Sequence, residues 1–267
     1  MVWYNRIVVF GLLCQLDKGI IILMDNIVNT IKSYNDCYEF KKMKDKIIII
    51  FEKHNMALPI WGLYSNSIHQ KCQLFTFDTH SDTHPPFTAL LVRNSEIVDN
   101  NYSKKYCVSS ILKGNRFKFN TFSFDDVYNL ANNYINNTEQ IKIAYDWNYI
   151  LCYNIISSDP AAKSKEKEDI KYYNCSYHSK KNWINTLQFD EKLAPVIIDF
   201  DLDFFTCFDD FKVMKNPLMK RLINATNLIT IAKEPTYFKS CKKSILDFTY
   251  TNESALTHLI KLIDNVS

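Results

Sequence analysis

The fold is indicated most clearly by residues 74–82, which read Leu74-Phe75-Thr76-Phe77-Asp78-Thr79-His80-Ser81-Asp82. Its apolar first half, residues 74–77, is too short for a helix and is typical of a strand buried on both faces in a parallel sheet. Its second half carries three polar side chains at alternate positions, which an extended segment would direct to one side. The combination indicates an α/β protein with a site beyond the carboxyl end of this strand.

Two further apolar runs end in the same way. Residues 47–51 read Ile-Ile-Ile-Ile-Phe and are followed by Glu52-Lys53-His54-Asn55, while residues 195–200 precede Asp201-Leu202-Asp203. In an open parallel sheet, ligands bind beyond the carboxyl ends of the strands. We therefore expect these two polar tips to meet residues 78–82 at one edge of the sheet.

The rest of the chain alternates between the two kinds of periodicity. Helical spacing is present in residues 24–43, 123–136 and 254–266, and strand-like runs in residues 141–145 and 228–232. Strands that alternate with helices predict a three-layer α/β fold with a mostly parallel, doubly wound sheet.

Two segments, residues 1–23 and residues 157–182, do not follow this alternation of strands and helices. We interpret residues 1–23 as an N-terminal extension of uncertain status, in which residues 7–24 form a buried strand pair; an alternative is that Met24 is the true start. The apolar run of residues 7–14 is far shorter than the ~20 residues that span a bilayer. Residues 24–267 are predicted to form a single catalytic domain, with a polar surface insert around residues 157–182.

Composition narrows the class of protein. Hydrophobic residues make up 47% of the chain and charged residues 23%, as in an ordinary soluble globular protein. The net charge of +3 is spread along the whole length, so we expect no nucleic-acid partner, and no membrane partner either. The eight cysteines are scattered and form no Cys-x-x-Cys pair, which favours reduced core cysteines and a cytoplasmic protein.

The polar strand tips contain six candidate metal ligands with oxygen or nitrogen donors. Such a set suits two hard or borderline divalent ions, for example Mn²⁺, whereas zinc sites take fewer ligands and often sulfur. Clustered carboxylates at strand ends are also unfavourable without cations. The alternative is that the two acidic motifs are only a polar turn and an exposed strand end. The candidate ligands are His54, Asp78, His80, Asp82, Asp201 and Asp203.

These motifs resemble those of the arginase and agmatinase (ureohydrolase) superfamily. Residues 78–82 are similar to its Asp-Ala-His-x-Asp motif, residues 198–203 to its Ser-x-Asp-x-Asp strand end, and residues 52–55 lie where it has Gly-Gly-Asp-His-Ser. The likeness covers residues 47–237. It extends in particular to a divergent branch with Glu-x-His-Asn and Asp-x-His-Ser-Asp-x-His-x-Pro motifs. That branch includes peptide arginases, which convert arginine within a peptide to ornithine.

The resemblance implies an arginase-like fold and two metal positions at the carboxyl ends of the strands. It implies that the two ions activate water as the nucleophile, which Asp82 would orient, and that Asp199 supports the ligands from behind. One ion would be held by His54, Asp78, Asp82 and Asp201. The other would be held by Asp78, His80, Asp201 and Asp203.

The chain also departs from the family pattern. Phe204-Phe205 replaces an Asp-Pro pair of the family. No histidine lies where arginases keep their distal proton shuttle. His84 is therefore a candidate general acid, and the alternative is that it packs on nearby prolines. Glu234 is a candidate partner for the guanidinium group, with Glu52 as second choice; either could be a surface carboxylate. Trp147 is a candidate for the pocket mouth, or a core residue.

These observations predict a hydrolase of guanidino C–N bonds that converts arginine in a peptide or protein to ornithine and urea. Residues 83–87 read Thr-His-Pro-Pro-Phe and offer few donors for a free amino acid, so we expect this rim to face an extended peptide. Two alternatives remain open. One is a deacetylase-type amide hydrolase on the same fold, and the other is a non-catalytic, metal-stabilised interaction protein.

Overall fold

A seven-stranded, mostly parallel sheet organises the protein. The computed structural model describes residues 22–34, 36–43, 45–80, 82–84, 87, 120–158, 174–242 and 249–266. The strand order is β1-β2-β7-β6-β3-β4-β5, and within this sheet β1 pairs antiparallel with β2 while all other pairs are parallel. The strands are β1 (Tyr38–Met43), β2 (Lys46–Phe51), β3 (Cys72–Asp78), β4 (Ile150–Ser157), β5 (Cys175–Ser179), β6 (Val196–Asp201) and β7 (Thr226–Ala232).

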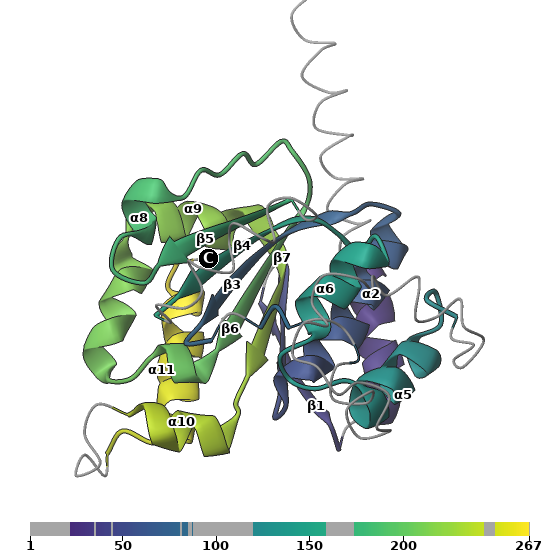
Figure 1. Cartoon of the computed structure of the whole chain (residues 1–267), viewed down its shortest axis with the longest axis horizontal. Helices are drawn as coiled ribbons and strands as arrows, with labels where there is room; N and C mark the ends of the chain where they lie inside the picture. The colour runs from purple at the N-terminus through teal and green to yellow at the C-terminus, as the bar shows by residue number, and fades with distance from the viewer. Residues whose placement is uncertain are drawn as a thin grey trace, which may run out of the picture.

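Helices cover both faces of the sheet, as Figure 1 shows. One face carries α2 (Ala57–Ile68), α5 (Phe124–Tyr134) and α6 (Gln140–Asp146), and residues 22–31 are also helical. The other face carries α8 (Trp183–Thr186), α9 (Pro217–Ala225) and α11 (Asn252–Asp264), while α10 (Pro235–Cys241) follows β7. The short 3₁₀ helices are η1 (Lys32–Tyr34), η2 (His54–Met56), η4 (Leu202–Phe204) and η5 (Phe208–Lys215). The predicted three-layer α/β fold is confirmed.

The continuous apolar run in β2 follows from its place inside the sheet. Every residue of β2 is buried. Ile47 and Ile49 pack into the core beneath α2, α5 and α6, whereas Ile48 and Ile50 pack into the core beneath α9 and α11. Because successive side chains of a strand point to opposite faces, a strand covered on both faces must be apolar throughout.

The register of the sheet brings the polar strand tips to one level. Phe51 pairs with Ala232 on β7, and Ala232 pairs with Asp201 on β6. Phe200 in turn pairs with Phe77 on β3, so Asp78 follows at the level of Asp201. The chain changes its direction across the sheet between β3 and β6, which is where ligands bind in doubly wound sheets.

The helix predicted over residues 24–43 is too long. Residues 22–31 are helical and η1 ends the segment, after which residues 38–43 form the edge strand β1. Tyr38 and Met43 are buried at its two ends, and the exposed residues between them pair through the backbone with β2. Backbone pairing with the sheet has overridden the helical spacing of the apolar residues.

The strand predicted over residues 141–145 is also wrong, because this segment lies in helix α6 and the strand is β4. A short apolar run does not distinguish a strand from a buried helix by periodicity alone. The insert predicted around residues 157–182 is partly wrong as well. Residues 175–179 form β5, which pairs with β4 at the other edge of the sheet, while residues 159–173 lie outside the described residues.

The described residues cover the predicted N-terminal extension and the predicted catalytic domain only in part. Residues 1–21 lie outside the described residues, and residues 22–24 are helical, which contradicts a strand pair that reaches Met24. The single domain of residues 24–267 stays a prediction. Among the described helices, none has the length and apolar character needed to cross a membrane.

A test of the packing concerns Gly62 on α2. A Cβ atom at this position would lie 2.7 Å from Cε2 of Tyr149. The ring has little room to retreat, because Tyr149 is 2% exposed and its hydroxyl donates to the carbonyl of Thr121. We expect Gly62→Ala to lower the free energy of unfolding by about 1–3 kcal/mol in urea denaturation, although alanine is the better helix former. The penalty should largely disappear in a Tyr149→Leu background, and an unchanged stability of the single variant would contradict this packing.

Candidate metal centre

Three strand tips supply the six predicted ligands, and the structure brings them to one edge of the sheet. β2 leads into η2, which begins at His54, β3 ends at Asp78, and β6 ends at Asp201. Asp201 caps η4, since its side chain accepts the backbone N–H of Asp203. The four aspartates and His54 are buried, and the side chain of His80 is 45% exposed.

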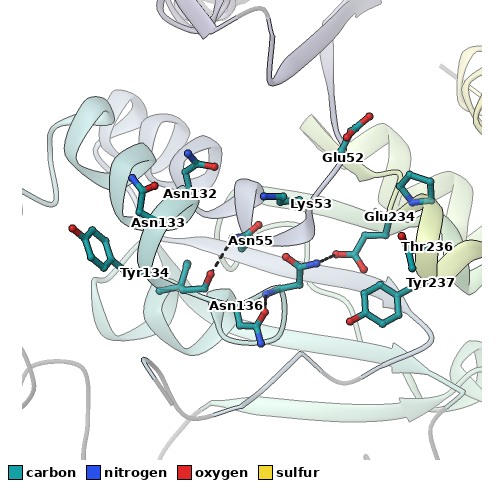
Figure 2. A pocket seen from close by; sticks show the side chains of 13 residues that line it. Glu52, Lys53, Asn55, Asn132, Asn133, Tyr134, Asn136, Glu234, Thr236 and Tyr237 are labelled. Atoms are coloured by element: carbon teal, nitrogen blue, oxygen red, sulfur yellow. Dashed lines mark hydrogen bonds between the residues drawn. The ribbon is translucent and has the colours of Figure 1, made fainter. Parts of the chain in front are cut away.

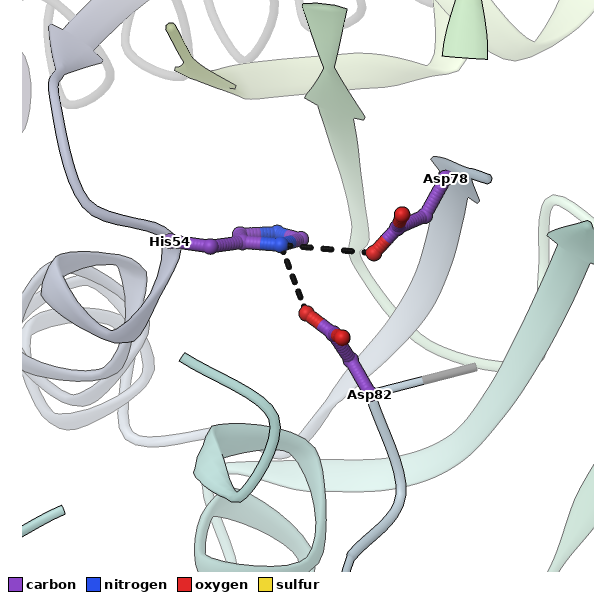
Figure 3. A group of neighbouring side chains, drawn as sticks. All are labelled: His54, Asp78 and Asp82. Carbon is purple, nitrogen blue, oxygen red and sulfur yellow. Dashed lines mark ion pairs between the residues drawn. The ribbon is translucent and has the colours of Figure 1, made fainter. Parts of the chain in front are cut away.

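One group of ligand atoms gathers around Nδ1 of His54. This nitrogen lies 2.7 Å from Oδ2 of Asp82 and 3.4 Å from Oδ2 of Asp78, as Figure 3 shows. Oδ2 of Asp201 is 3.5 Å from the same nitrogen. His54, Asp78 and Asp82 could hold one metal ion together, since one atom of each lies within 4.8 Å of the others.

A second group gathers around Nδ1 of His80. This nitrogen lies 3.2 Å from Oδ2 of Asp203 and 3.7 Å from Oδ1 of Asp78. Asp78, His80 and Asp203 could therefore hold a second ion. The two oxygens of Asp78 face different groups, which is the arrangement of a carboxylate that bridges two cations. Although Asp201 lies near His54, it is in neither set of described residues whose atoms could together hold an ion, so its predicted bridging role stays a prediction.

The hydrogen bonding of His54 fits a metal ligand. Nε2 lies 2.6 Å from Oδ2 of Asp199, so it carries a proton, and in the neutral imidazole Nδ1 then carries a lone pair. Nδ1 of His54 and Oδ2 of Asp78 are buried, and neither has an aligned hydrogen-bond partner in the described part of the chain. A lone pair that faces carboxylate oxygens is repulsive unless a cation lies between them.

The electrostatics of the cluster lead to the same conclusion. Burial, followed by the charges of neighbouring carboxylates, raises the pKa of Asp82 to about 6 and that of Asp201 well above its usual value. Burial lowers the pKa of His54, but the carboxylate of Asp199 outweighs it and the net pKa is well above normal. Hydrogen bonds to carboxylates raise the pKa of His80 to about 11. The cluster thus strongly favours added positive charge.

A buried polar network holds His54 from behind, and the sheet register builds it. Thr76, Asp199 and Thr230 pair directly across β3, β6 and β7. Both threonine hydroxyls donate to the Asp199 carboxylate, at 2.9 Å and 2.6 Å. With the His54 bond, Asp199 accepts three hydrogen bonds, so its place behind the ligand agrees with the supporting role implied by the resemblance.

Gln140, the first residue of α6, also contacts the cluster, and the loop between α5 and α6 contacts the segment beside it, which the sequence did not reveal. Nε2 of Gln140 donates to Oδ2 of Asp82 at 2.8 Å, and Gln140 is fully buried. The carbonyl of Thr138 accepts the N–H of His84 at 2.8 Å, and Oε2 of Glu139 accepts the N–H of Phe87 at 3.1 Å. This loop therefore positions the segment that follows β3. The sequence carries little signal for this contact, because the apolar run of residues 141–145 fits a strand as well as a buried helix.

Glu234 reaches the cluster from the end of β7. Its side chain is buried, and Oε1 accepts the backbone N–H of His54 at 3.0 Å and a bond from Nδ2 of Asn137. Its φ of 36° lies in the left-handed region, where a non-glycine residue often marks a functional site. Burial raises its pKa to about 7. Glu234 is therefore not a surface carboxylate.

A pocket of about 450 Å³ lies beside residues that neighbour the candidate ligands. Figure 2 shows the side chains that line it. It contains none of the six predicted ligands, but Asn55 follows His54 in the chain and the ring of Tyr237 packs against His80 with ring centroids 5.7 Å apart. Its lining residues are Glu52, Lys53, Asn55, Asn132, Asn133, Tyr134, Ile135, Asn136, Asn137, Glu234, Pro235, Thr236 and Tyr237.

Of the other predicted site residues, some lie near the candidate metal centre or its pocket and some do not. Glu52 is exposed and lines the pocket, and His84 is exposed near residue 138. Trp147 does not line the pocket mouth: it follows α6 and precedes β4, at the opposite edge of the sheet, and packs against the core. The predicted rim is also wrong at Thr83 and Phe87, which are buried, while residues 85 and 86 lie outside the described residues.

Comparisons with known proteins show a likeness in structure but none in sequence. No protein-family model matches the sequence, and no curated protein matches it. Among solved structures, the chain is similar to an arginase from Medicago truncatula, with 10% sequence identity and a TM-score of 0.44. The match covers 81% of this chain and 58% of that arginase, so the chain spans little more than half of its length.

The bridging position of Asp78 is testable by metal content. Asp78→Asn should remove both ions, because a neutral amide does not bridge two cations well, and the loss should exceed the roughly 10- to 100-fold fall in affinity that loss of an outer-shell partner causes. Mass spectrometry of metals in protein purified without chelators measures it. Asp209→Asn is the matched control, since this exposed aspartate pairs only locally with Lys212. Two retained ions in Asp78→Asn would exclude the bridge.

The role of Gln140 can be tested separately. Gln140→Leu should weaken the ion held by His54 and Asp82 by about 10- to 100-fold and leave the other ion less affected, because Asp82 loses the donor that orients it. Gln73→Leu is the control, because this buried glutamine donates to backbone carbonyls at the amino ends of the strands. Equal metal affinities in both variants would show that Gln140 has only a packing role.

Proposed function

We propose that this protein is a metal-dependent hydrolase of guanidino C–N bonds that acts on arginine within a peptide or protein. In this reaction water adds its oxygen to the guanidino carbon, the bond to the side-chain nitrogen breaks, and that nitrogen takes a proton. The products are ornithine and urea. Two divalent ions, which we propose to be Mn²⁺, would lower the pKa of water enough to supply the nucleophile at neutral pH.

One observation carries the proposal, namely the Nδ1 lone pair of His54 among three carboxylates. A bound metal ion would make this arrangement favourable, and the second oxygen of Asp78, which faces His80, provides for a second ion. Carboxylate oxygens suit Mn²⁺, and imidazole completes such a ligand set, whereas zinc sites often contain sulfur ligands. Such a pair of ions is suited to hydrolysis.

Three side chains have proposed roles in the reaction other than binding the ions alone. Asp82 is held by Gln140 and lies at the first metal group, where it can orient the attacking water. Glu234 is a buried carboxylate beside His54 and can pair with a guanidinium group in charge-assisted hydrogen bonds. His84 is exposed on the segment after Asp82 and remains our candidate for the general acid that protonates the leaving nitrogen.

The preference for a peptide draws support from the pocket. Its volume of about 450 Å³ lies in the range of pockets that hold whole small molecules rather than a single group. Its wall is rich in carboxamides, which can both donate to and accept from peptide amides. A cytoplasmic location, and the lack of nucleic-acid and membrane partners, remain predictions alongside this one.

Substrate specificity is tested with three substrates in parallel. Protein loaded with Mn²⁺ should release urea from an arginine-containing peptide and act poorly on free arginine and agmatine. The peptide should lose about 42 Da, the mass difference between a guanidino group and an amine in this hydrolysis. Asp78→Asn, assayed at the same protein concentration, should release no urea.

Each other result points to a different conclusion. A preference for free arginine would overturn the peptide reading. Deacetylation of an acylated amine without urea release would favour the amide-hydrolase alternative. No turnover of any substrate by protein that holds two ions would favour a non-catalytic, metal-stabilised protein.

A further inference from the structure

Strand β1 forms one edge of the sheet and is only partly covered by the rest of the protein. It stands at the end of the strand order, and among the described residues no strand lies on its outer side. Its two end residues, Tyr38 and Met43, are buried, while the four residues between them are exposed. Because successive side chains of a strand point to opposite faces, both faces of its middle are uncovered within the described structure. Such an edge can accept a further strand.

The exposed side chains of β1 include one large aromatic ring between two opposite charges. Phe40 is 39% exposed, although a phenylalanine is usually found inside a protein. Its neighbours in the strand are Glu39 and Lys41, which both point to the other face of the sheet. The side chain of Glu39 is 62% exposed even though it pairs with Lys233. The edge therefore presents an apolar group on one face and two opposite charges on the other.

A second copy of this strand matches the pattern in one register. In a two-fold symmetric antiparallel pair of identical strands, residues directly opposite each other must lie on the same face, so the symmetry axis passes beside a residue. When this residue is Phe40, its ring faces the same ring of the second copy, and Glu39 faces Lys41 of the partner subunit. When it is Glu39, Lys41 or Lys42, two like charges lie directly opposite each other, which is unfavourable.

We propose that the protein forms a two-fold symmetric dimer in which β1 pairs antiparallel with β1 of a second copy, centred on Phe40. The two sheets then join into one continuous sheet. The contact combines backbone hydrogen bonds with an aromatic pair and two opposite-charge pairs, each of which stabilises antiparallel strands. This inference concerns an interaction surface and does not depend on the proposed function.

The symmetry of this dimer leaves both metal centres accessible. A two-fold axis perpendicular to the sheet reverses the direction of every strand, so the carboxyl ends of the parallel strands lie at opposite edges of the joined sheet in the two copies. β1 also contributes no residue to the pocket. A single pair of six-residue strands is a small interface, so we expect the dimer to be weak and to dissociate on dilution.

The test uses two charge variants of the full chain and sedimentation velocity between ~1 μM and ~1 mM. Wild-type protein should show a monomer–dimer equilibrium in this range. Lys41→Glu and Glu39→Lys each place like charges opposite each other at both charge pairs of the dimer. Each variant should therefore dimerise about 10- to 100-fold more weakly than wild type. Circular dichroism verifies that the variants are folded.

An equimolar mixture of the two variants should recover dimer formation, because each charge then again faces its opposite. Lys212→Glu is the matched control, since it makes the same charge change at an exposed lysine of η5 that pairs locally with Asp209. It should dimerise as wild type does. The inference is overturned by a wild-type protein that stays monomeric up to ~1 mM, by single variants that dimerise like wild type, or by a mixture that does not recover.

The centre of the register is tested by Phe40→Ala. Loss of the aromatic pair should weaken dimerisation about 3- to 10-fold in the same experiment. Phe208→Ala is the control, because Phe208 on η5 has the same exposed fraction of 39% and lies on a different element. An equal effect of the two alanine variants would place the contact elsewhere and overturn the proposed pairing.

Discussion

The hydrogen bond between Nε2 of His54 and Asp199 is the interaction on which the rest of the site depends. It fixes the imidazole ring and directs Nδ1 at the carboxylates beyond. Asp199 can do this because two threonine hydroxyls also donate to it and no face of it is exposed. A carboxylate with three donors is a stable buried anion, and its negative charge makes the imidazole a stronger ligand.

The same bond explains the position of the candidate metal centre. Asp199 is a strand residue whose two neighbours across the sheet are threonines, so a slip of one residue in register would turn it to the opposite face. The position of His54 is thus set by sheet pairing, while Glu234 holds its backbone from the end of β7. The sheet register thus places both the candidate ligands at the strand ends and the side chains that hold them from behind.

The sequence predicted what depends on strand ends and missed what depends on tertiary contacts. Each polar tip follows a buried run, and parallel strands necessarily present such tips together, so the grouping of His54 with Asp78 was predictable. Gln140 was missed, because the apolar run that follows it fits a strand or a buried helix equally well and only packing decides. For Trp147 the sequence left two positions open, and the structure selects the core. Asn55 appeared as part of a motif, but its Nδ2 donates to carbonyls about 80 residues away, which no local pattern encodes.

The strand order has a consequence for how the protein folds. β6 and β7 lie between β2 and β3 in the sheet, although they follow both in the chain. His54 and Asp78 therefore belong to strands that become fixed relative to each other only when the later strands insert between them. Assembly of the site requires contacts of large sequence separation, which slow folding. During synthesis, the carboxylate cluster can form only after β7 and Glu234 have left the ribosome, so the nascent chain carries these charges dispersed and hydrated until the central strands are in place.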